Sequence, residues 1–124
     1  MAEGEDIKVE FVKEKLMAVV TVDMTQTTKP YIDSFGVYHG PVTYINVHYY
    51  TVWIDKDENE IWYRIAHWTN VGVREYTDTL SFEDGEIKRE TINELKRIIL
   101  NEDEDGLIEF LEEWGIYQKL PEED

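Results

Sequence analysis

The spacing of hydrophobic residues changes from a period of two to a helical period near residue 84. In the first part, apolar and charged residues alternate over 7–11, and the run 16–24 is rich in β-branched side chains. Both patterns predict half-buried β-strands. The segment 71–82 continues the same pattern, and Glu83-Asp84-Gly85 ends it.

The strongest strand signal is a hairpin that joins segments 42–54 and 61–68 through a polar turn. If the turn closes symmetrically, His48 lies opposite His67 on one face. The other face then carries four large aromatic residues, Tyr49, Trp53, Trp62 and Trp68. A bulge with Asn59 in the left-handed conformation would shift the pairing by one residue and separate the two histidines. Both faces of this hairpin are apolar. If helices pack on one face, the other face also needs something to pack against it.

Two helices are predicted after residue 84. Thr91-Ile92-Asn93-Glu94 has the spacing of a capping box and predicts the start of the first helix. The second helix is predicted to begin at Asp105, and Gly115 is placed to end it in a left-handed cap.

Strands followed by helices predict one α+β domain over 1–124. We expect a mainly antiparallel meander of about four or five strands with two C-terminal helices packed on one face. The sheet region is 1–84, the two-helix region is 85–120, and 121–124 is expected to be a frayed tail. Because 25–41 holds two prolines and two glycines, it is expected to be a long surface loop. Its aromatic residues either serve a function or pin the loop to the body; they are Tyr31, Phe35, Tyr38 and His39.

Composition excludes several classes of protein. The 124 residues include no cysteine, so disulfides, thiolate metal sites and cysteine nucleophiles are excluded. The net charge of −16 argues against direct binding to nucleic acid or anionic lipid. The first residues are acidic, unlike a signal peptide, and no apolar run is long enough to span a bilayer. We therefore expect a cytoplasmic protein that does not contact membranes.

His48 and His67 are the one pair that could perform acid–base chemistry or begin a metal site. The alternative is that both pack within the sheet, with their nitrogens bonded to backbone or water. No catalytic serine motif, phosphate-binding glycine loop or zinc spacing is present in the sequence. Asn101, Asp103 and Asp105 resemble part of a calcium loop, but the second helix would begin inside that loop. We therefore predict no enzyme, no metal and no cofactor, with a hydrolase that uses the histidines as the third-ranked hypothesis.

Negative charge concentrates near the C-terminal end, where 83–124 holds 15 acids and 5 bases. The candidate partner-binding residues form an acidic ridge on the second helix: Asp103, Glu104, Asp105, Glu109, Glu112 and Glu113. A charged helix face also serves solubility alone, so both interpretations stay open. Large aromatic residues anchor most interfaces. The aromatic face of Tyr49, Trp53, Trp62 and Trp68 could therefore anchor the partner or form the seam of a homodimer.

In size and charge the chain resembles toxin immunity proteins and viral inhibitors of host defence. The leading hypothesis is a non-enzymatic protein-interaction module, an inhibitor or immunity-type protein that binds a basic, nucleic-acid-handling partner protein. It could act as an anti-defence protein of a virus or mobile element, or as a nucleic-acid mimic. The alternative is a small-ligand protein that takes a nucleotide-like anion. Its pocket would use six residues, Tyr31, Tyr38, His48, Arg64, His67 and Arg74.

Overall fold

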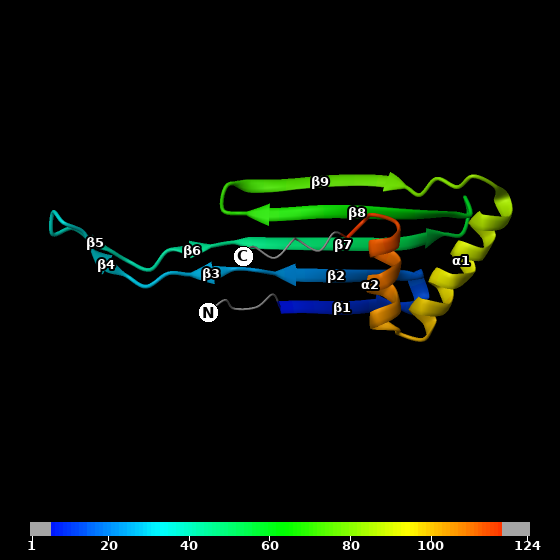
Figure 1. The fold of residues 1–124 in the computed structure, drawn as a ribbon, viewed down its shortest axis with the longest axis horizontal. Helices are drawn as coiled ribbons and strands as arrows, with labels where there is room; N and C mark the ends of the chain where they lie inside the picture. The colour runs from blue at the N-terminus through cyan, green and yellow to red at the C-terminus, as the bar shows by residue number, and fades with distance from the viewer. Residues whose placement is uncertain (1–5, 118–124) are drawn as a thin grey trace.

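The sheet has five antiparallel strands in the order β1-β2-β7-β8-β9, with helices α1 and α2 near one end of it (Figure 1). The computed structural model describes residues 6–117. The predicted α+β class and the two C-terminal helices are confirmed. The frayed tail predicted at 121–124 lies outside the described residues. The strands span Asp6–Val12 (β1), Met17–Asp23 (β2), Asn46–Asp55 (β7), Glu60–Thr69 (β8) and Gly72–Thr79 (β9).

The core lies between one face of the sheet and the two helices. Alternate residues of β2 and β7 are buried, as expected for strands with one covered face. The largest fully buried side chains come from the strands and from both helices; they are Val20, Val52, Ile61, Leu95, Ile98, Ile99, Leu107, Phe110 and Leu111. The outward-facing residues between the buried positions of β2 and β7 form no part of this core. We call that second side of the sheet the open face.

The predicted register of the central hairpin is confirmed, with His48 paired to His67 and Trp53 paired to Trp62. Asn59 does adopt a left-handed conformation, with a φ of 55°, but the pairing does not slip. The bulge at Asn59 that would have separated the histidines therefore does not form. Asn59 lies inside a turn closed by the pair of Asp55 and Glu60, so it inserts no extra residue into the ladder.

Helix α1 (Gly85–Leu100) begins earlier than predicted. Its N-cap is Asp84, whose carboxylate accepts a hydrogen bond of 2.9 Å from the backbone N–H of Ile87. Thr91 is therefore inside the helix, where its hydroxyl donates to the carbonyl oxygen of Ile87. Helix α2 (Glu104–Glu113) begins within one residue of the predicted start, and the left-handed conformation of Gly115 is confirmed by its φ of 72°.

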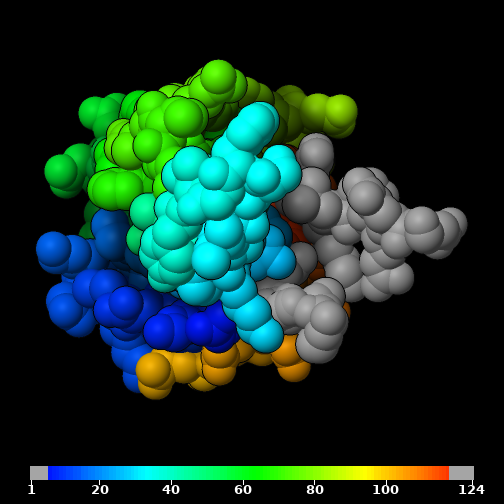
Figure 2. Space-filling view, turned by 90° about the vertical axis from the view of Figure 1, so that its left-hand side faces the viewer, coloured from blue at the N-terminus to red at the C-terminus, as the bar shows by residue number. Residues whose placement is uncertain are grey.

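The segment predicted as a surface loop is a β-hairpin that projects from the sheet (Figure 1). We call Thr25 to Ile45 the arm. It contains four short strands, Gln26–Thr27 (β3), Tyr31–Ile32 (β4), Tyr38–His39 (β5) and Thr43–Tyr44 (β6). The two prolines lie between these strands, where no ladder hydrogen bond is lost. In Figure 2, which faces the left-hand side of Figure 1, the arm (cyan) stands in front of the sheet.

Candidate functional site

The acidic ridge lies on the side of α2 that faces away from the core. The exposed acids are Glu104, Asp105, Glu109, Glu112 and Glu113, while Leu107, Phe110 and Leu111 between them are buried. The nearby ion pair joins Lys13 to Glu102, with 3.1 Å between Nζ and Oε2. No ridge carboxylate forms an ion pair with any residue in the part of the chain that the structure describes. The ridge is therefore a concentration of unpaired negative charge.

Asp103 differs from the other ridge residues because it caps α2. Its carboxylate accepts a hydrogen bond of 3.0 Å from the backbone N–H of Gly106, and its side chain is only partly exposed. Glu104 and Asp105 lie in the first turn, where negative charge is favoured by the helix dipole. These three acids therefore have a structural role, and Glu109, Glu112 and Glu113 are the ridge residues without one.

The four predicted interface aromatics all lie on the open face. Trp53 and Trp62 stack with 6.3 Å between ring centroids, and Tyr49 meets Trp68 edge to face at 6.1 Å. Trp62 Nε1 is buried and finds no acceptor among the described residues. Arg64 lies over the ring of Trp53 at 5.8 Å. The register predicted from the sequence therefore placed these four aromatic residues on one face correctly.

The acidic ridge and the aromatic residues lie on opposite sides of the sheet. The buried residues of α2 pack against the face that carries Val20 and Val52, and the aromatic residues occupy the alternate positions of β7 and β8. A single flat partner surface cannot contact both. The ridge and the aromatic residues are therefore two separate candidate surfaces.

His48 and His67 stack on the helix-covered side of the sheet. Their ring centroids are 4.0 Å apart, with an angle of 13° between the rings. His67 Nε2 is 2.5 Å from the Oδ1 atom of Asn46, and His48 also stacks on Tyr50. Within residues 6–117, no three histidine, aspartate or glutamate side chains cluster as metal ligands would. The arrangement matches the alternative in which the histidines pack within the sheet.

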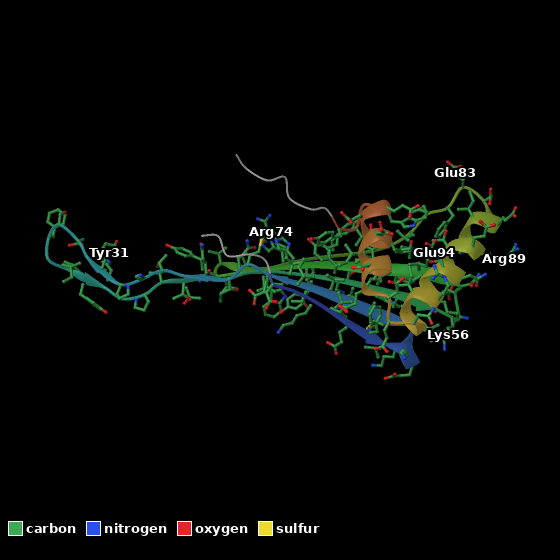
Figure 3. The ribbon with its side chains drawn as sticks, turned by 60° about the horizontal axis from the view of Figure 1, so that its bottom comes forward. Tyr31, Lys56, Arg74, Glu83, Arg89 and Glu94 are labelled. Atoms are coloured by element: carbon green, nitrogen blue, oxygen red, sulfur yellow. The ribbon has the colours of Figure 1, made fainter. Side chains whose placement is uncertain are left out.

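The six residues of the predicted ligand pocket do not come together. His67 pairs with Arg74 in the sheet, and His48 stacks beside them. Arg64 is on the open face, where it contacts Trp53. Tyr31 and Tyr38 belong to the arm, and Figure 3 shows Tyr31 near the far end of the arm, well away from Arg74. The composite pocket is therefore wrong, and only its histidine–Arg74 part is assembled.

A hollow of about 370 Å³ lies beside this remaining part, at the turn between β8 and β9. It is lined by His67, Thr69, Val71, Gly72, Val73 and Arg74. The hollow is lined by the guanidinium of Arg74, a group that donates hydrogen bonds to anions. The Thr69 hydroxyl beside it already donates to the carbonyl oxygen of Gly72, and His67 Nε2 is bonded to Asn46.

The arm is a functional candidate that the sequence indicated only as a loop, whose aromatic residues either serve a function or pin the loop to the body. Eight of its apolar side chains are between 41% and 90% exposed: Tyr31, Ile32, Phe35, Val37, Tyr38, Val42, Tyr44 and Ile45. The interpretation that its aromatic residues pin a loop to the body was therefore wrong. Lys29 and Asp33 are its only charged residues, so the whole net charge of −16 lies outside the arm. The absence of net charge in this segment was the feature of the sequence that could have identified the arm.

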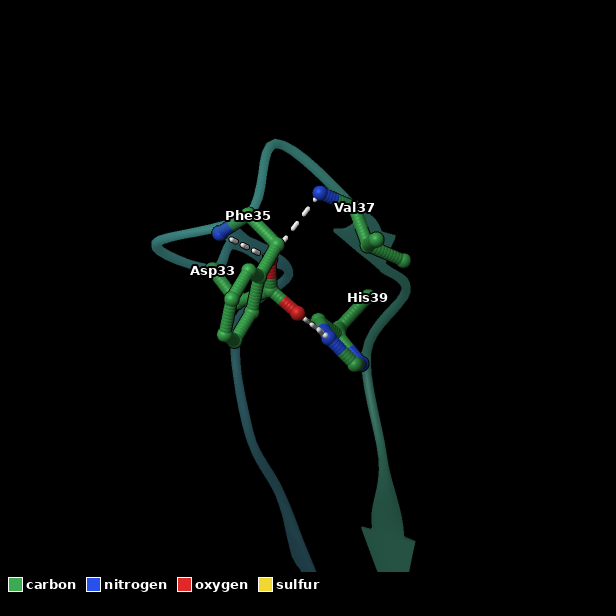
Figure 4. A network of polar contacts seen from close by, with 4 residues as sticks. All are labelled: Asp33, Phe35, Val37 and His39. Atoms are coloured by element: carbon green, nitrogen blue, oxygen red, sulfur yellow. Dashed lines mark hydrogen bonds and ion pairs between the residues drawn. The ribbon is translucent and has the colours of Figure 1, made fainter.

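The tip of the arm is held in one conformation by Asp33 (Figure 4). One carboxylate oxygen accepts hydrogen bonds of 2.9 Å from the backbone N–H groups of Phe35 and Val37. The other oxygen is 2.8 Å from His39 Nε2, and His39 stacks on Tyr31 at 4.7 Å. Phe35, which is 90% exposed, is therefore presented by an ordered turn.

These hydrogen bonds make the tip sensitive to acid. The hydrogen bond with His39, together with those from the backbone of Val37 and Phe35, holds the pKa of Asp33 below its usual value. A group whose pKa is lowered by folding stabilises the folded form above its unfolded pKa. The tip therefore keeps this stabilisation at neutral pH and loses it as the pH falls through the pKa of folded Asp33.

Comparisons with protein-family models, curated proteins and solved structures find no match for this chain. Neither helix among the described residues is long and apolar enough to cross a membrane.

Proposed function

We propose that this protein is a non-enzymatic binding protein that docks its acidic ridge on a basic, nucleic-acid-handling protein. The observation that carries the proposal is the ridge itself, where exposed carboxylates lie together without ion pairs among the described residues. Like charges at this density repel one another and oppose folding. Charge complementarity with a basic surface offsets that repulsion, speeds the encounter and selects the partner.

The class of such a protein is an inhibitor or immunity-type module. Carboxylates arrayed along a helix can occupy a groove that binds phosphates, so the chain would act as a nucleic-acid mimic. An anti-defence role in a virus or mobile element fits the same chemistry. The open face is the surface left for a homodimer, because it lies opposite the ridge and leaves the ridge accessible.

Charge reversal on α2 tests this proposal. The triple variant Glu109→Lys, Glu112→Lys and Glu113→Lys is expected to fold normally, because lysines near a helix C-terminus favour the helix dipole. In affinity capture from source-cell lysate at low salt, the native protein should retain a basic protein that high salt releases. The triple variant should lose it, with binding at least roughly 30-fold weaker.

A control variant changes the same amount of charge elsewhere. Glu58, Glu90 and Glu94 are exposed and belong to other elements, Glu58 to the β7–β8 turn and the other two to α1. Their reversal to lysine changes the net charge by the same amount. This control should retain the basic protein as well as the native chain does. Equal retention by the α2 variant would contradict the proposal and leave the ridge a solubilising surface.

The hollow beside Arg74 favours a second candidate function, the binding of a small anion. Differential scanning fluorimetry with inorganic phosphate and nucleotides should then show stabilisation that rises with concentration. At roughly a hundred times Kd this stabilisation is about 2.7 kcal/mol. Arg74→Ala should remove the effect, while Arg64→Ala, on the open face, should not. A native protein that no anion stabilises would rule this function out.

A further inference from the structure

No element of the described chain packs on two of its apolar surfaces. One is the open face of the sheet, and the other is the arm. On the open face Trp68 and Val73 are each 47% exposed, while Tyr49, Trp53 and Trp62 are half-buried. Apolar residues that lie together on a surface mark interaction sites.

The arm has only two charged residues, Lys29 and Asp33, in a chain whose net charge is −16. The charged residues of the open face lie mainly on its edge strands, such as Lys8, Glu10 and Glu75, and at strand ends, so its centre is poor in charge.

The open face has very little charge at its centre. On β2, β7 and β8 the outward positions between the strand ends carry one charged residue, Arg64, whose guanidinium lies over Trp53. The acids on these outward positions are at the strand ends, such as Asp23, Asp55 and Glu60. The acidic ridge is on the other side of the sheet. A second negatively charged chain can therefore approach the open face without meeting the ridge.

The arm cannot cover the open face of its own chain. At its base, Asn70 accepts a hydrogen bond of 2.6 Å from the backbone N–H of Ile45 and donates one of 2.7 Å to the carbonyl oxygen of Thr43. A further hydrogen bond joins Met24 to Asn46. These bonds hold the arm in line with β2 and β7, pointing away from the sheet (Figures 1 and 3).

The arm matches the open face in length and in chemistry. Each leg of the arm has about ten residues, or about 33 Å when extended, which is the length of β7 with its 10 residues. A two-stranded ribbon about 10 Å wide and about 30 Å long has a footprint of about 300 Å². Each contact buries about 300 Å² of the arm and about 300 Å² of the face beneath it. Two such contacts bury about 1,200 Å² in total, which is the lower end of the range for specific interfaces.

We infer that the arm of one chain lies across the open face of a second copy, whose arm lies across the first chain in return. The result is a two-fold symmetric dimer in which one interface covers both apolar surfaces. Direct stacking of two open faces would leave the arms exposed, and pairing of two arms would leave the faces exposed. The inference does not depend on the proposed function, because the acidic ridge is outside this interface.

Sedimentation velocity of the purified chain over a wide concentration range is the first test. We expect a reversible dimer with twice the mass of the chain. A chain that stays monomeric up to millimolar concentration would overturn the inference, and the arm would then serve a different protein or a membrane. Salt separates this test from that of the proposed function. Screening should strengthen association of two like-charged chains, whereas it weakens binding of a basic partner.

Two variants define the contact. The arm variant carries Ile32→Ser and Tyr38→Ser, both at exposed positions, and the face variant carries Trp68→Ser. Each alone should weaken dimerisation by roughly 30-fold or more. Val73→Ser, at the register partner of Trp68, replaces the face variant if Trp68→Ser does not fold. A dimer of native strength in either variant would overturn the inference.

Mixing the two variants gives the decisive result. The intact arm of the face variant can lie on the intact face of the arm variant, so the mixture should form a heterodimer with one of the two contacts. If both variants are monomers and the mixture is too, the arm does not bind the face and the inference fails. The matched control is Val71→Ser, which removes an equally apolar side chain that is 97% exposed in the β8–β9 turn. It should dimerise as the native chain does.

Discussion

The substitution Phe110→Ala is expected to lower the free energy of unfolding by about 3–5 kcal/mol. Phe110 is 2% exposed and is the largest fully buried side chain among the described residues. Its ring lies 6.4 Å from that of Trp114, which also packs against the core. Removing the ring leaves a cavity between α2 and the sheet. Urea denaturation followed by circular dichroism measures the loss.

The effect should be large because α2 cannot form alone. It has 10 residues, and isolated helices of fewer than about 12 residues are marginal in water. The exposed acids of α2 repel one another as well, so the helix depends on its buried residues. A typical domain is stable by about 5–15 kcal/mol, so one lost side chain removes a large share of the total.

Phe35→Ala is the matched control for this substitution. It deletes the same ring from a position that is 90% exposed at the tip of the arm. The expected change in the free energy of unfolding is within about 0.5 kcal/mol. Equal losses for Phe35→Ala and Phe110→Ala would contradict the division of the molecule into a packed body and an independent arm.

The sheet could be predicted because its signals are local. The polar turn after Ile54 and the alternation on both sides of it fix the register, and the register decides which residues share a face. This is why Tyr49, Trp53, Trp62 and Trp68 were grouped correctly. The same alternation separates Arg64 from His67, so the composite ligand pocket conflicted with the predicted register from the start.

The start of α1 could not be read from the same kind of signal. Asp84 and Thr91 both match N-cap patterns, and the apolar stripe begins only at Ile92. The first turn is held by the cap at Asp84 rather than by buried residues, since Ile87 is exposed. Apolar periodicity therefore detects the packed part of this helix and misses its exposed first turns.

The arm was predicted as a loop rather than a hairpin because its prolines and glycines are typical of loops. Pro30 and Pro41 interrupt the ladder between short strands, and Gly36 takes a φ of 81° in the tip. The order of the tip comes from Asp33 and His39, a contact across the hairpin that requires the strands to pair first. Large apolar residues in a turn-rich segment are usually expected to pack against the body. In the arm most of these residues are exposed instead.

Excision of the arm is expected to abolish self-association without unfolding the body. In this variant residues 26–44 are replaced by Asn-Gly, which forms a type I′ turn between Thr25 and Ile45. Because β2 and β7 are already antiparallel neighbours, the new turn connects them without changing their register. The residues removed include none from the hydrophobic core.

At a concentration where the native chain is monomeric, the free energy of unfolding should change by no more than about 1 kcal/mol, because two small terms oppose each other. Losing the hydrogen bond from Asn70 to Thr43 costs about 1 kcal/mol. Shortening the connection recovers about 0.6 kcal/mol for each halving of its length. Denaturation measures the stability, and sedimentation velocity measures the association. An excised chain that unfolds would mean that the arm belongs to the folding core. One that folds and still dimerises would contradict the arm-on-face contact and point to direct association of the open faces, because the arm would be gone.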